Sequence, residues 1–156
     1  MLDLTLIAHG KIKEKAYQKM VEEYLKRLKP LARLKYIELE AVSFSSKNQE
    51  AIKKLEGEKL NNYLEKYLNN NSGAVVYLLA ERGQKFNSVD FAHWLNKKQP
   101  LILVIGGALG FSDEIYNSYP SLSLSDLTYP HELARLILLE QIYRAATILN
   151  NKNYHY

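Results

Sequence analysis

The most apolar stretch of this 156-residue chain, residues 130–150, is interrupted by polar and charged side chains, and five of them are its first candidates for chemistry. They are His131, Arg135, Glu140, Gln141 and Arg144. On a helix, Glu140 and Arg144 stand four residues apart and can form an ion pair, whereas Arg135 and Glu140, five apart, lie too far round. Buried charges are costly unless they are paired. The pattern therefore predicts either ion pairs at an interface or a functional site.

A glycine-rich turn directly follows the apolar segment 101–105, which is typical of a buried strand. The turn contains Gly106, Gly107 and Gly110. Ligands of open α/β sheets bind at the carboxyl ends of strands, and glycines let the backbone approach a ligand closely. The turn has neither the lysine and hydroxyl of a P-loop nor the dinucleotide fingerprint. A plain tight turn and a ligand-binding loop are both compatible with it.

The segment 121–131 is unusual because three serines and Thr128 interrupt its apolar alternation. Pro130 suits the first turn of the helix that follows. One interpretation is a loop with a helix cap. The other is a loop whose exposed amides and carbonyls hold a small polar ligand.

The chain ends in three ring-bearing residues, Tyr154, His155 and Tyr156. Frayed termini are usually inert. Rings in a row can instead stack on an unpaired nucleobase.

Several classes of function are disfavoured by what the composition lacks. The absence of cysteine excludes disulfides and thiolate metal sites, and the four histidines lack metal-ligand spacing, so we expect no metal. No serine stands in a nucleophile elbow. No segment approaches the apolar length of a membrane span, and the N-terminus lacks the features of a secretory signal. We therefore expect a cytoplasmic protein without a membrane partner.

The net charge of +4 favours anionic partners, and it is unevenly distributed. Residues 11–35 hold nine lysines and arginines against three glutamates. A solvated helix face and a surface that binds phosphates both fit this bias.

Apolar periodicity predicts the elements that must position these residues. Strands are expected at 2–8, 34–42, 74–80, 101–105 and 122–124. Helices are expected at 12–28, 51–68, 88–95, 111–119 and 130–150, with a polar turn at 43–48. Strands that alternate with helices predict an α/β fold, a mostly parallel sheet with flanking helices in a single domain, 1–156. The last helix is apolar almost all round, which predicts a homodimer interface.

Taken together, these motifs resemble the RlmH family of SPOUT-class methyltransferases. The resemblance is carried by Gly106-Gly107-x-x-Gly110, by the stretch from Ser121 to His131, by Arg135, by Leu139-x-Gln141-x-Tyr143-Arg144-Ala145 and by the terminal Tyr154-His155. Weaker similarities cover the rest of the chain, among them Leu78-Leu79-Ala80-Glu81-Arg82-Gly83.

The resemblance implies a fold, a cofactor and an assembly. The fold is α/β with a C-terminal trefoil knot, and the assembly is a homodimer. The cofactor is S-adenosylmethionine, held by knot loops that correspond here to these residues: Leu79, Gly106, Gly107, Leu124, Ser125, Asp126, Leu127, Thr128 and Tyr129.

The resemblance also implies the reaction, which is methylation of N3 of a pseudouridine in 23S ribosomal RNA within the assembled ribosome. We expect His155, or else His131, to assist loss of the N3 proton. Tyr154 is expected to stack on the base, and Arg135 or Arg144 to stabilise negative charge. The alternatives are methylation of transfer RNA and a non-catalytic, dimeric RNA-binding or ribosome-assembly factor of the same fold.

Overall fold

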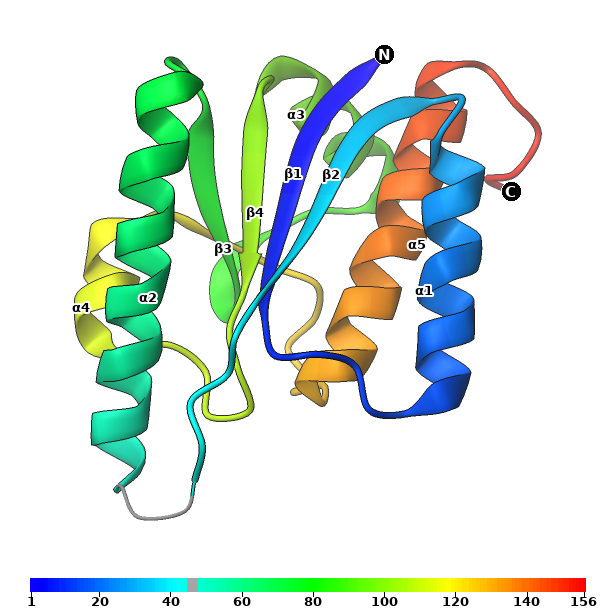
Figure 1. The fold of residues 1–156 in the computed structure, drawn as a ribbon. Helices are drawn as coiled ribbons and strands as arrows, with labels where there is room; N and C mark the ends of the chain where they lie inside the picture. The colour runs from blue at the N-terminus through cyan, green and yellow to red at the C-terminus, as the bar shows by residue number, and fades with distance from the viewer. Residues whose placement is uncertain (45–47) are drawn as a thin grey trace.

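A five-stranded, all-parallel sheet forms the centre of the computed structural model, which describes residues 1–44 and 48–156 (Figure 1). The strands are β1 (Leu2–His9), β2 (Ala32–Leu39), β3 (Val75–Lys85), β4 (Leu101–Ile105) and β5 (Ser121–Ser123), in the order β2-β1-β4-β3-β5. The helices are α1 (Lys15–Leu28), α2 (Gln49–Asn70), α3 (Ser88–Lys97), α4 (Asp113–Ser118) and α5 (His131–Leu149). This arrangement confirms the predicted α/β fold.

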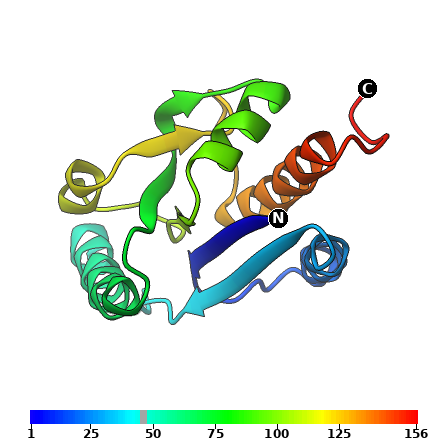
Figure 2. The ribbon, with the colours of Figure 1, turned by 90° about the horizontal axis from the view of Figure 1, so that it is seen from above.

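Helices cover both faces of the sheet (Figures 1 and 2). Helices α1, α3 and α5 pack with Leu4, Leu6 and Leu103 in one hydrophobic core. Helices α2 and α4 pack with Ile7, Val104 and other residues in a second core on the opposite face. Since β4 lies between β1 and β3 and is covered on both faces, all five of its residues are buried. Its continuously apolar sequence follows from that position.

The crossover helices place the carboxyl ends of β3 and β4 at an opening in the structure. Helix α3, which connects β3 to β4, lies on the α5 side of the sheet, while α4, which connects β4 to β5, lies on the α2 side (Figure 2). In an open parallel sheet, connections that leave neighbouring strands towards opposite faces open a crevice where ligands bind. The glycine turn after β4 lies at this point.

Most of the predicted elements are confirmed, with differences at their ends. The second strand ends at Leu39 and does not reach Val42, and the helix cap expected at Ser88 is Asn87, whose side chain accepts a hydrogen bond from the Asp90 amide. Of the turn predicted at 43–48, residues 45–47 lie outside the described residues.

Strand β3 is the largest departure, because it continues to Lys85 instead of ending at residue 80. Both Leu79 and Gln84 pair with Leu122 of β5, so the residues between them form a bulge. Bulges are typical of strand ends that re-aim the chain beside a site. The residues of this extension are mostly polar, so a continuous run of apolar residues predicts a strand that ends at residue 80.

Helix α5 lies against α1, α3 and β4. Among its buried residues are Leu138, Leu139, Ile142, Ala145 and Ala146. Much of its all-round apolar surface is therefore covered within the chain. Within the described residues, no helix combines the length and apolar character needed to cross a membrane.

Candidate functional site

The first wall of the candidate site is the glycine turn after β4. The Gly110 amide donates a hydrogen bond to the Gly107 carbonyl at 3.0 Å, which closes a tight turn. A Cβ on Gly107 would come within 2.5 Å of Glu56 Oε2, behind the turn, and a Cβ on Gly106 within 3.2 Å of the Gly110 backbone. The turn needs glycine because its neighbours are so close, and it presents backbone to the opening. This segment can therefore be both a tight turn and a ligand-binding loop, the two interpretations that the sequence left open.

The second wall is the polar loop after β5, which serine side chains hold in shape. The Ser123 hydroxyl accepts a hydrogen bond from the Ser125 amide at 3.2 Å and donates one to the Ser125 carbonyl at 2.8 Å. The Ser125 hydroxyl then accepts one from the Leu127 amide at 3.0 Å. Such local bonds stabilise turn conformations in place of a strand ladder. The serines that interrupted the apolar alternation therefore set the path of this loop.

Between these walls and the end of β3 lies a cavity of about 590 Å³. A volume of this order suits a cofactor-sized ligand. The structure brings eight of the nine predicted cofactor residues to its lining, namely Leu79, Gly106, Gly107, Leu124, Ser125, Leu127, Thr128 and Tyr129. Asp126 is not among the lining residues, and its carboxylate pairs with Lys85.

The lining also contains residues that were not singled out from the sequence. Ile105 directly precedes the glycine turn, whereas Tyr116 comes from α4, where no sequence signal pointed to a site. Apolar side chains such as Leu79, Ile105 and Leu124 can pack on a flat ring system. Backbone groups and hydroxyls can then fix the orientation of the ligand, which is the usual design of a cofactor site. The residues present thus fit S-adenosylmethionine.

His131 lines the same cavity at the first turn of α5. Burial is the main cause that lowers the pKa of its imidazole, and the nearby Arg135 guanidinium lowers it further. The ring is therefore neutral at neutral pH and able to accept a proton.

A second cavity, of about 780 Å³, adjoins the first one, since Ser123, Leu124 and Tyr129 line both. His155 lines this second cavity with Gln141 of α5 and with residues 86–91 around the start of α3. His155 Nδ1 lies 3.4 Å from Arg144 Nη1. The structure thus brings His155 and Arg144 together. Neither of them lines the first cavity, but His155 lines the second cavity, which adjoins it.

Tyr154 is held against α5 by its hydroxyl and its ring. The hydroxyl donates a hydrogen bond to Glu140 Oε1 at 3.1 Å, and the ring meets Tyr143 edge-on at 4.8 Å between centroids. The Arg144 guanidinium lies 4.9 Å from the centre of the Tyr154 ring. These contacts favour a role in anchoring the tail over the predicted stacking on a base.

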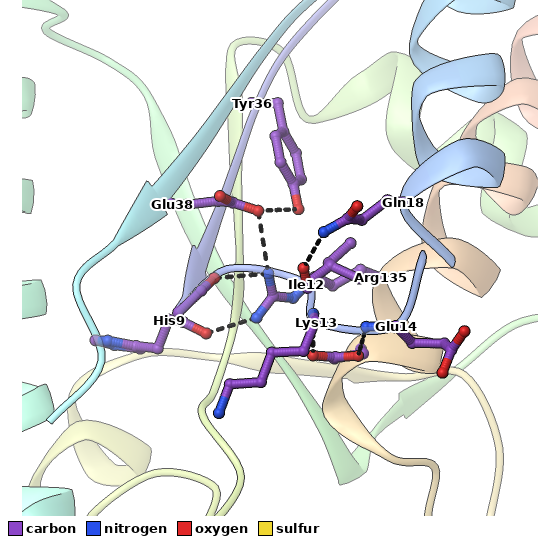
Figure 3. Close-up of polar contacts among 10 residues, drawn as sticks. His9, Ile12, Lys13, Glu14, Gln18, Tyr36, Glu38 and Arg135 are labelled. Atoms are coloured by element: carbon purple, nitrogen blue, oxygen red, sulfur yellow. Dashed lines mark hydrogen bonds and ion pairs between the residues drawn. The ribbon is translucent and has the colours of Figure 1, made fainter. Parts of the chain in front are cut away.

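Arg135 lies inside the protein, where its side chain is 0% exposed (Figure 3). It donates hydrogen bonds to the carbonyls of His9 at 2.5 Å and Gly10 at 2.8 Å, and its Nη1 lies 3.5 Å from Glu38 Oε1. The end of β1 is thereby fixed to the start of α5. This placement favours a structural role over the predicted contact with negative charge on RNA.

Glu132 joins the start of α5 to the segment just before α1. Its carboxylate accepts hydrogen bonds from the amides of Lys13 at 2.7 Å and Glu14 at 3.2 Å, just before α1. These two bonds, with burial working against them, lower the pKa of Glu132. Neither of these long-range links, through Arg135 or through Glu132, could be predicted from the sequence.

His9 is 2% exposed, and its Nδ1 has no hydrogen-bond partner among the described residues. Burial lowers the pKa of His9 to about 4, with smaller contributions from Lys59 and Arg135. An unfolded histidine titrates near 6.5, so between about pH 6.5 and 4 the unfolded chain binds more protons. The free energy of unfolding should therefore fall as the pH falls through this window, by about 2 kcal/mol from pH 7.5 to 5.

Urea unfolding of the wild type and of His9→Gln at these two pH values measures this contribution. The glutamine variant cannot titrate, so its stability should fall by about 2 kcal/mol less than that of the wild type. Equal falls in both proteins would contradict the assignment.

The nine basic residues between positions 11 and 35 are all exposed, on α1, β2 and the adjoining loops. Among the residues that the structure describes, no group of three or more histidine, aspartate or glutamate side chains is placed to hold a metal ion.

Known proteins resemble this chain over nearly its whole length. The family described as "Predicted SPOUT methyltransferase" matches residues 2–155. A "Ribosomal RNA large subunit methyltransferase H" of Kosmotoga olearia is 42% identical, over 99% of this chain and 100% of the relative. Proteins of the same name from Acetivibrio thermocellus and Carboxydothermus hydrogenoformans are 40% and 39% identical, over 97% and 99% of this chain and 98% and 99% of theirs. A solved structure described as "Crystal structure of an hypothetical protein" has a similar fold, with a TM-score of 0.51, 16% identity, and coverage of 95% of this chain and 69% of that one.

Proposed function

This chain belongs to the SPOUT methyltransferase family, and from that premise we propose that it methylates large-subunit ribosomal RNA with S-adenosylmethionine as the methyl donor. The single observation that carries the proposal is the cavity between the glycine turn and the polar loop, which joins cofactor-type residues from three separate segments. The relatives named as ribosomal RNA methyltransferases from Kosmotoga olearia and Carboxydothermus hydrogenoformans each match 99% of this chain.

When bound, S-adenosylmethionine supplies a methyl group that its sulfonium already activates for transfer. The protein therefore needs to hold the acceptor in line, and good orientation of two reactants is worth about 7–11 kcal/mol. Leu79, Gly106 and the loop from Leu124 to Tyr129 would hold the cofactor. The second cavity adjoins this site and supplies room for an unstacked base.

The acceptor that we propose is N3 of a pseudouridine in 23S ribosomal RNA, methylated in the assembled ribosome. This nitrogen must lose its proton as it gains the methyl group. His155 accepts the proton in our proposal, and His131 is the other candidate, since its imidazole lines the cofactor cavity and is neutral at neutral pH. Arg144, next to His155, stabilises the negative charge that the base carries after the proton leaves and before the methyl group arrives.

We also propose a homodimer, a C-terminal trefoil knot and a cytoplasmic location, where the substrate ribosomes are. The dimer is supported by partly exposed apolar residues that remain on α5, among them Leu133, Leu136 and Ile137. The exposed basic residues on α1 and β2 supply positive charge for RNA phosphates.

The substrate is tested by incubating the protein and methyl-labelled S-adenosylmethionine with three substrates: unmodified ribosomes, naked ribosomal RNA and transfer RNA. We expect label in the large-subunit RNA of ribosomes. Label only in transfer RNA would favour the other enzyme class, and label nowhere would favour a non-catalytic RNA-binding factor. Either of these results would refute the proposal.

A further inference from the structure

The C-terminal tail does not fray from the end of α5 but folds back along it. The Lys152 amide donates a hydrogen bond to the Thr147 carbonyl at 2.9 Å, and the Asn151 amide donates one to the Ile148 carbonyl at 3.1 Å. Asn151 has a positive φ of 52°, which asparagine tolerates better than most residues. This turn reverses the chain and brings Tyr154 and His155 next to the middle of the helix.

Glu140 is the residue of α5 to which the tail is hydrogen-bonded. Its Oε1 accepts hydrogen bonds from Arg144 Nη2 at 2.6 Å and from the Tyr154 hydroxyl at 3.1 Å. Its Oε2 accepts one from Gln141 Nε2 at 2.6 Å, and Gln141 in turn accepts one from the Ser88 hydroxyl at 3.2 Å. One carboxylate thus connects α5, the tail and, through Gln141, the start of α3.

This arrangement is more than an exposed ion pair. The side chains of Arg144 and Glu140 are only 25% and 20% exposed, whereas Glu50 in the ion pair with Lys53 is 76% exposed. Exposed pairs add little, but hydrogen bonds to shielded charged groups are stronger and fix geometry. Burial, and hydrogen bonds with Tyr24 and Glu140, raise the pKa of the Tyr154 hydroxyl above its usual range, so it stays protonated and able to donate.

The consequence concerns His155, whose ring has its one hydrogen-bond contact among the described residues with Arg144. Arg144 is itself held by Glu140 on one side and by the Tyr154 ring on the other. A guanidinium can only donate, so the 3.4 Å contact holds His155 by the lone pair of its Nδ1. This is the nitrogen that takes the N3 proton in our proposal, once Arg144 turns from it towards the negative charge on the base. The direction of the imidazole at the second cavity is therefore set through the Glu140 carboxylate.

We propose that Glu140 is a positioning residue for methyl transfer, whose carboxylate orders the tail and Arg144 so that His155 is presented at the second cavity. This inference rests on the proposed function, because it is through that reaction that His155 and Arg144 act. Glu140 lines neither cavity, so it contacts neither cofactor nor base in this assignment.

Three variants test the proposal in single-turnover methyl transfer to ribosomes, with cofactor affinity measured in parallel. Glu140→Leu removes both acceptor oxygens, and we expect the transfer rate to fall roughly tenfold or more while cofactor affinity stays within about twofold. Glu140→Gln keeps one carbonyl acceptor and should recover most of the rate. The control, Glu50→Gln, removes an ion pair on the opposite layer and should leave both quantities unchanged. A wild-type rate in Glu140→Leu, or no recovery in Glu140→Gln, would overturn the proposal.

A spectroscopic measurement separates failure of this inference from failure of the proposed function. Tyrosine labelled with ¹³C at Cζ gives a signal for each ring, and Tyr154→Phe identifies the one that belongs to Tyr154. In Glu140→Leu this signal should move and titrate at a lower pH than in the wild type. If the wild type transfers no methyl group, the proposed function fails, and this signal still decides the role of Glu140 in ordering the tail. An unchanged signal and titration would overturn it.

Discussion

Replacing His155 by alanine is expected to lower the rate of methyl transfer to ribosomes by about 100-fold or more, the usual contribution of a positioned proton acceptor. The N3 proton would then have to leave to water without a base at hand. His155 lines the second cavity and not the first one. Cofactor affinity should therefore stay within about twofold of the wild type, since the loss is confined to the reaction step.

Single-turnover rates and calorimetric titration with S-adenosylmethionine measure the two effects. His93→Ala is the matched control, because His93 is exposed on α3 and lines neither cavity. His131→Ala tests the other candidate base, which lies in the cofactor cavity. An unchanged rate in His155→Ala, combined with a large loss in His131→Ala, would transfer the role to His131.

Gly83→Ala is expected to disturb the cofactor cavity, because a Cβ at Gly83 meets closer neighbours than a Cβ at any other glycine of the chain. Gly83 lies in the bulge of β3, where a Cβ would come within 2.4 Å of the Leu122 carbonyl carbon and 2.6 Å of its amide nitrogen. These are backbone atoms of β5, which cannot rotate away as the end of a side chain can. Either the bulge or β5 must move, and such overpacking typically costs about 1–3 kcal/mol or more.

The displacement would reach the site because the loop from Leu124 to Tyr129 continues directly from β5. We expect affinity for S-adenosylmethionine to fall about tenfold or more, and the free energy of unfolding to fall by about 2 kcal/mol. The control is Gly73→Ala, since nothing lies within 4 Å of a Cβ at Gly73 and its cost arises from a positive φ of 91° alone. That variant should lose some stability but keep its cofactor affinity. Full cofactor affinity in Gly83→Ala would contradict the close packing of bulge and strand.

The alternation of strands and helices could be predicted from the sequence because each strand and each helix has its own pattern of apolar residues. The buried strand 101–105 is apolar throughout and was predicted with its observed bounds, Leu101–Ile105. The glycine turn after it was predicted as a candidate site because ligands gather at the carboxyl ends of parallel strands. Local pattern and sheet geometry were sufficient for these features.

Long-range contacts could not be predicted in the same way. Arg135 was interpreted as a residue that could meet negative charge on RNA, but its guanidinium is buried against carbonyls of His9 and Gly10, more than a hundred residues away in sequence. Nothing in the sequence indicated that Glu56 packs behind Gly107, where the structure places its carboxylate. Asp126 lies within the predicted cofactor loop, yet it pairs with Lys85 because the bulge brings β3 alongside that loop. Each of these contacts depends on how separate elements meet, which no local pattern contains.

The tail shows the same contrast between local pattern and tertiary structure. The spacing of Glu140 and Arg144 predicted an ion pair, and the pair is confirmed at 2.6 Å. The sequence did not reveal that Tyr154 shares the same carboxylate, since this contact depends on the turn at Asn151. The terminus is folded against α5 instead of fraying, and its His155 lines the second cavity.

The most direct test of this account is nucleoside mass spectrometry of large-subunit RNA from ribosomes incubated with the protein and S-adenosylmethionine that carries a deuterated methyl group. We expect one pseudouridine to gain the deuterated methyl group at N3, a smaller fraction of it to be methylated by Gly83→Ala at limiting cofactor, and none to be methylated when the protein is left out. Deuterium found only in a different nucleotide or only in transfer RNA, or absent from all RNA, would contradict the account.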